Sequence, residues 1–100
     1  MTPTATTLAG EITVSLPSDF PEADAAALHV ACNILVHRVG CSAVAVTTRS
    51  NGERTWLYAV IHCDGNSVEI DTNMSHLGNL RMHALAMALL LEELAEQLTP

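Results

Sequence analysis

Two dipeptides, Asn51-Gly52 and Asp64-Gly65, restrict the fold more than any other feature of the sequence. Both pairs favour the two-residue type I′ turns that join antiparallel strands. The residues that flank them alternate between apolar and polar side chains, as strands with one buried face do. The sequence therefore predicts an antiparallel meander of three strands over residues 41–71.

Two-residue loops would fix the register of this meander by counting along its strands. The first loop would place Val46 opposite Leu57, and the second would place Cys63 opposite Asn66. Opposed residues lie on the same face of a sheet, so the two turns together define one apolar face. Its expected members are Val44, Val46, Leu57, Ala59, Ile61, Cys63, Val68 and Ile70.

The opposite face of the meander carries the only Trp and the only Tyr of the chain. Counting places Trp56 opposite Thr47, and Tyr58 between Ala45 and Asp71. Small neighbours would leave both rings projecting from the sheet. The expected partner-binding residues are Arg49, Arg54, Trp56, Tyr58, His62, Glu69 and Asp71.

Two interpretations of this outer face stand. Trp, Tyr and Arg dominate the energetics of protein interfaces, which favours contact with a partner. Alternatively, Trp56 and Tyr58 stabilise the hairpin by cross-strand packing. The chain has no third helix to cover the face, and this favours the first interpretation.

A strand and a helix are predicted to precede the meander. The segment 11–16 alternates as a half-buried strand does. A helix over 20–39 is indicated by the capping-box spacing of Asp19 and Glu22, by Pro21 in its first turn, and by Gly40 as its left-handed stop. Its expected inward stripe is Ala27, Leu28, Ala31, Leu35 and Val39.

A second helix is predicted over residues 75–98, with Asn73 or Ser75 as its cap. Apolar residues cover more than one side of this helix, so it is either sunk in the core or shared with another chain. The second alternative predicts a homodimer. Its expected interface is Met82, Leu85, Leu89 and Leu90.

The predicted order of elements is β-α-β-β-β-α, which specifies an α+β fold. A crossover from the first strand to the second would be parallel, giving a two-layer domain with a four-stranded mixed sheet and both helices packed on one face. Residues 1–10 are expected to be a flexible lead, and residues 11–100 a single domain.

The charge of the chain excludes some partners. It has four Arg, no Lys and eleven acids, for a formal charge of -7, which would repel a phosphate backbone. We therefore expect no direct nucleic-acid binding. Near the end of the second helix, Glu92, Glu93 and Glu96 oppose the helix dipole, so they are either solvated acids or a docking patch for a basic partner.

Compartment and chemistry are constrained by smaller signals. The cysteines are odd in number and form no CxxC pair, which favours a reducing compartment. We also find no signal peptide and no apolar stretch long enough to span a bilayer. The sequence therefore predicts a cytoplasmic protein without membrane contact. His62 and Cys63 would point to opposite faces of one strand, so we expect no metal site and no cofactor. His62, Ser67 and Glu69 would lie on an open sheet, which disfavours proton-transfer chemistry and predicts a protein that is not an enzyme.

These observations favour a small acidic module that binds another protein and regulates or inhibits a larger complex, including one that handles nucleic acid. Phage-encoded anti-CRISPR inhibitors combine small size, negative charge and absence of catalytic residues in this way, as a class and without a shared motif. The alternative is a structural subunit or assembly factor of an oligomeric complex. A small enzyme that uses His62 is the third hypothesis.

Overall fold

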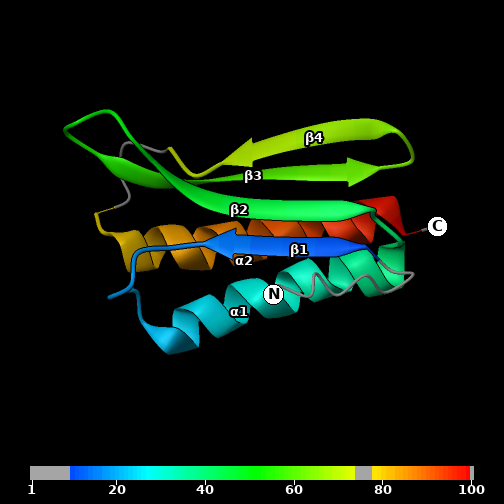
Figure 1. The fold of residues 1–100 in the computed structure, drawn as a ribbon, viewed down its shortest axis with the longest axis horizontal. Coiled ribbons are helices and arrows are strands. Elements are labelled where there is room, and N and C mark those ends of the chain that lie inside the picture. Colours follow the sequence, from blue (N-terminus) through cyan, green and yellow to red (C-terminus); the bar gives the residue numbers. More distant parts are fainter. Residues whose placement is uncertain (1–9, 74–77, 100) are drawn as a thin grey trace, which may run out of the picture.

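The computed structural model describes residues 10–73 and 78–99, which form an α+β domain of two layers (Figure 1). The predicted lead therefore lies almost wholly outside the described residues, as does Ser75. The elements are β1 (Glu11–Ser15), α1 (Glu22–Asn33) with its π-helical continuation η1 (Ile34–Val39), β2 (Ala43–Ser50), β3 (Thr55–Cys63), β4 (Asn66–Asp71) and α2 (Leu80–Leu98).

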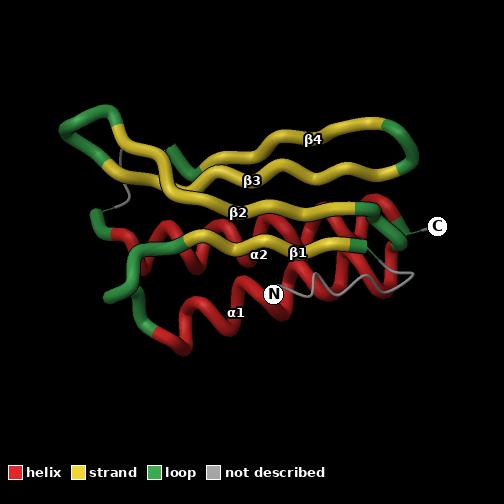
Figure 2. The backbone as a smooth tube through the Cα atoms, viewed as in Figure 1, coloured by secondary structure: helices red, strands yellow, loops and turns green. Residues whose placement is uncertain are grey.

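The four strands form one mixed sheet in the order β1-β2-β3-β4, with β1 parallel to β2 and the other neighbours antiparallel. Figure 2 shows the helices gathered in one layer, where α1 and α2 run side by side in the same direction. No helix of the described residues lies over the other face of the sheet. The predicted fold class and element order are confirmed.

The second hairpin has the predicted register, with Cys63 opposite Asn66. Its two loop residues both have positive φ, 53° at Asp64 and 80° at Gly65, as a type I′ turn requires. Asp is tolerated in this region because its short side chain can bond locally.

The predicted register of the first hairpin is wrong by two residues. Val46 lies opposite Ala59 rather than Leu57, because the loop holds four residues, 51–54, instead of two. The Asn51 side chain accepts hydrogen bonds from the backbone N–H groups of Glu53 at 3.0 Å and Arg54 at 2.9 Å, so it organises the longer loop itself. A shift of two residues leaves every side chain on its predicted face.

The apolar face of the sheet packs against the helices as predicted. Val44, Val46, Leu57, Ala59 and Ile61 are fully buried, while Cys63, Val68 and Ile70 pack at the margin of the core. On α1 the buried side follows Leu28, Ala31, Cys32, Leu35 and Val36. Ala27, expected inside, is exposed because this spacing centres the inward side of the helix on Leu28.

The starts of both helices differ from prediction. Pro21 occupies the N-cap position of α1 without a side-chain hydrogen bond, so the capping box of Asp19 is not formed. The end of that helix is as predicted, at Gly40 with φ of 91°. Helix α2 begins at Leu80, because the Asn79 side chain accepts a 3.0 Å hydrogen bond from the Met82 N–H and caps the helix there.

Candidate partner-binding surfaces

The outer face of the sheet carries a cross-strand ladder of three side chains. Arg49 on β2 lies over the ring of Tyr58 on β3, with 3.5 Å between its guanidinium carbon and the ring centroid. The Tyr58 hydroxyl donates a 2.5 Å hydrogen bond to the Glu69 carboxylate on β4. This bond stabilises the protonated phenol and raises the pKa of Tyr58. One side chain from each of three adjacent strands is thus held in place before any partner arrives.

Trp56 lies beside this ladder, opposite Arg49 rather than Thr47 as expected. Both Trp56 and Tyr58 are half-buried, so they do not project freely from the sheet. The four-residue loop explains the change, because it moves Arg49 into register with Trp56 and Thr47 into register with Tyr58. The stacked Arg49 therefore covers one aromatic ring and neighbours the other.

His62 and Ser67 form a separate polar pair at the other end of the outer face. The His62 Nδ1 and Ser67 Oγ lie 2.8 Å apart on exposed side chains. Glu69, the acid that a proton-transfer set would need beside them, is hydrogen bonded to Tyr58. A His–Ser pair needs a third group to orient the ring and donors for a developing oxyanion. The arrangement is that of a solvated cross-strand pair.

Arg54 lies away from the rest of the expected partner-binding residues. It belongs to the loop before β3 and lines a hollow of about 240 Å³ near the start of α2, together with Gly78, Asn79, Leu80 and His83. The expected set is therefore divided. The outer face itself holds Arg49, Trp56, Tyr58, His62, Glu69 and Asp71.

A buried polar pair that sequence reasoning missed ties α2 to the end of the sheet. The fully buried Thr72 hydroxyl lies 2.7 Å from the Nδ1 of His83 and accepts a 3.0 Å hydrogen bond from the Leu57 N–H. Burial lowers the pKa of His83, against the smaller opposing effect of its Thr72 contact. Thr72 follows the last strand and His83 lies in α2, eleven residues later, so no local sequence pattern predicts this contact.

The cysteines behave as structural residues. Burial raises the pKa of the Cys32 thiol to about 11 and, together with a hydrogen bond to Cys63, that of Cys41 to about 12. All three are free thiols. Across residues 10–73 and 78–99, His, Cys, Asp and Glu side chains form no group of three that could hold a metal ion.

The solvent side of the helical layer is the second candidate surface. Met82, Leu85 and Leu89 are all substantially exposed on one side of α2, and Val30 is exposed on α1. Leu90, expected with them, is half-buried and lies toward the sheet, where it shares a hollow with Val68 and Ile70. The sequence alone could not place Val30, because its exposure depends on how α1 packs beside α2.

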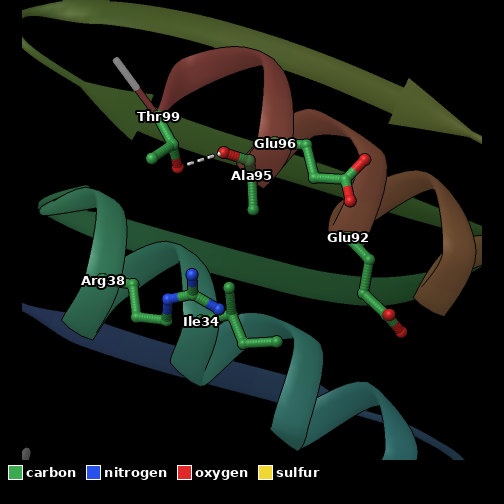
Figure 3. Close-up of a pocket in the computed structure, with 6 residues that line it drawn as sticks. All are labelled: Ile34, Arg38, Glu92, Ala95, Glu96 and Thr99. Carbon is green, nitrogen blue, oxygen red and sulfur yellow. Dashed lines mark hydrogen bonds between the residues drawn. The ribbon is translucent and has the colours of Figure 1, made fainter.

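The three acids of α2 do not gather into one patch. Glu92 and Glu96 line a groove of about 300 Å³ between the ends of the two helices, across from Ile34 and Arg38 (Figure 3). In that view the Glu92 carboxylate points away from the Arg38 guanidinium. Glu93 lies on the other side of the helix, beside the Val68 hollow.

Comparison with known proteins does not assign the chain to a family. Neither a protein-family model nor a curated protein matches the sequence. Among the described residues, neither helix combines the length and hydropathy that crossing a bilayer requires.

Proposed function

We propose that this protein is an interaction module that binds a second protein through the open face of its sheet. The observation that carries the proposal is the ladder of Arg49, Tyr58 and Glu69. The three side chains hold one another in place. They therefore lose less conformational entropy when a partner binds than unrestrained side chains would lose. Half-buried Trp56 beside the ladder adds the aromatic area typical of interface hot spots.

The partner proposed has a basic surface. The outer face carries the exposed acids Glu11, Glu69 and Asp71 against the single guanidinium of Arg49, and the whole chain has a formal charge of -7. Complementary charge speeds association and selects among partners more than it raises affinity. We expect binding to weaken with added salt, because exposed charges are screened over about 10 Å at 0.1 M.

The proposed role is that of a regulator or inhibitor in the cytoplasm. A module whose described residues hold no metal-binding cluster can act by occupying a surface of its partner. Three free thiols fit a reducing compartment. The second candidate, a structural subunit or assembly factor, is favoured by the exposed apolar side chains on the helical layer.

Matched arginine variants test the proposal in two stages. Extract of the source cells is passed over the immobilised wild-type chain, Arg49→Ala, Tyr58→Ala and Arg38→Ala, and the retained proteins are compared by quantitative mass spectrometry. Arg38 is an exposed arginine outside the outer face and serves as the control. Any protein retained selectively is then purified and titrated against each variant at two salt concentrations.

We expect one partner that the wild type and Arg38→Ala bind equally, with at least tenfold weaker binding to Arg49→Ala and Tyr58→Ala, as loss of a hot-spot side chain gives. Far-ultraviolet circular dichroism confirms that each variant is folded. Equal affinity of all four folded proteins for the purified partner would refute the assignment of the outer face.

A further inference from the structure

The solvent side of the helical layer exposes four large apolar side chains, which we call the helical face. Val30 is 59% exposed, Met82 44%, Leu85 64% and Leu89 58%. The exposed residues that precede Val30 on this side of α1 are small, namely Ala23, Ala26 and Ala27. Small side chains let another helix approach closely.

The four side chains lie close together because α1 and α2 are aligned in register. Arg81 Nε lies 2.9 Å from Asp24 Oδ2, which sets the two helices level near their starts (Figure 1). Val30 follows Asp24 by six residues, and Met87 follows Arg81 by six residues. Both helices rise about 1.5 Å per residue, so Val30 lies level with Met87. Leu85 and Leu89 flank that level on either side.

We propose that the helical face binds a second copy of this chain across a two-fold axis at the level of Val30 and Met87. The axis runs in the plane of the interface and perpendicular to the helices, so α2 packs antiparallel on α2 of the second copy. Leu85 then meets Leu89 of the second copy, and Val30 meets its own counterpart. The same patch serves both copies, as a two-fold interface requires.

Charge supports a second copy as the occupant. Arg81 precedes Met87 by six residues and Glu92 follows it by five, and both line hollows on the side of α2 that faces the first helix. The antiparallel arrangement keeps the α1 side of each α2 over the α1 side of the other, so it brings Arg81, whose side chain is 71% exposed, near Glu92 of the second copy. The acids that oppose their own helix dipole at the end of α2 would lie beside the positive start of the other α2.

The size of the helical face predicts a weak dimer. A helix of 19 residues is about 28 Å long and a packed pair about 20 Å wide, so each copy offers roughly 550 Å². Both copies together reach about the lower limit of a specific interface, which indicates dissociation in the micromolar range. The two open sheet faces would point away from each other, leaving both accessible to partners.

Analytical ultracentrifugation over a concentration series tests the dimer. We expect a monomer–dimer equilibrium for the wild type, and dissociation at least a hundredfold easier for Leu85→Glu and Leu89→Glu, since each places two carboxylates in the apolar centre. Leu98→Glu is the matched control, because Leu98 is an exposed leucine of α2 outside the helical face. Its dimerisation should be unchanged.

A charge swap tests the antiparallel arrangement. Arg81→Glu should weaken the dimer, and adding Glu92→Arg should restore it. Loss of the Asp24 ion pair within one copy would not explain such a recovery. A wild-type chain that stays monomeric at several hundred micromolar would overturn the proposal. So would a dimer that all the leucine variants retain, or one that the charge swap fails to restore.

Discussion

The buried Thr72 hydroxyl should stabilise the fold more than its size suggests. Thr72→Val replaces it with a methyl group of nearly the same shape, so packing is preserved while three polar contacts are lost. The weakest, 3.4 Å to the Leu57 carbonyl oxygen, leaves no unpaired group because that oxygen also accepts from the Thr72 N–H. The Leu57 N–H loses its 3.0 Å acceptor and the His83 Nδ1 loses its 2.7 Å partner. Each buried polar group left without a partner costs about 1–3 kcal/mol. We expect a loss of about 2–6 kcal/mol for the two groups together.

Urea unfolding followed by Trp56 fluorescence measures this loss, with Thr72→Ser as the control. The serine variant keeps the hydroxyl and removes one methyl group, so it should lose only about 1 kcal/mol. An unchanged m-value is needed to read the shift in midpoint as stability, and all variants are compared at one protein concentration. Hydrogen exchange should show a less protected Leu57 amide in Thr72→Val alone. If Thr72→Val loses no more stability than Thr72→Ser, the polar contacts do not stabilise the fold as reasoned.

Three further predictions concern titratable side chains. Burial lowers the pKa of His83 in the folded state, so as the pH falls the unfolded chain takes up this proton before the folded chain does. The free energy of unfolding should therefore keep its full value above pH 6.5 and decrease below it. The decrease should be smaller in His83→Gln than in the wild type. Urea midpoints of both proteins over a pH series measure this difference, and parallel curves would contradict the role given to His83. Glu69→Gln should lower the pKa of Tyr58, measured by ultraviolet absorbance titration, because the phenol loses its carboxylate acceptor; an unchanged titration would show that the ladder is not formed in solution. Cys63, which is partly exposed, should react with iodoacetamide before Cys32 and Cys41, whose thiols are buried with pKa values of about 11 and 12. Peptide mass spectrometry after timed quenching measures the order, and early labelling of either buried thiol would contradict it.

The sequence predicts this fold well where local chemistry decides the structure. Asp64-Gly65 adopts the positive φ values that its turn requires, so the second hairpin is correct residue by residue. Asn51-Gly52 gives a similar signal, yet the Asn51 side chain caps a loop of four residues instead. The predicted faces are still correct, because a shift of two residues matches the side-chain period of a strand.

The sites are less predictable because they depend on contacts between elements. The stacking of Arg49 on Tyr58 follows from the longer loop, which brings Arg49 opposite Trp56. Counting residues with a shorter loop places Thr47 there. The exposure of Val30 likewise depends on the packing of α1 beside α2, which periodicity does not specify.

Site-specific photocrosslinking in the source cells tests most directly whether the outer face binds a different protein while the helical face binds a second copy of the chain. A photoreactive phenylalanine derivative replaces Ala45, an exposed residue of the outer face beside the ladder, in one variant and Leu89 on the helical face in another. The crosslinked products are identified by mass spectrometry after purification. A third variant, with the derivative at the exposed position Ala26 near the edge of the helical face, reports how far that interface extends.

We predict that the derivative at Ala45 joins the chain to a different protein with a basic surface, and that the derivative at Leu89 joins two copies of the chain. Adducts with a different protein at Leu89, together with none at Ala45, would contradict the assignment of partner binding to the outer face of the sheet.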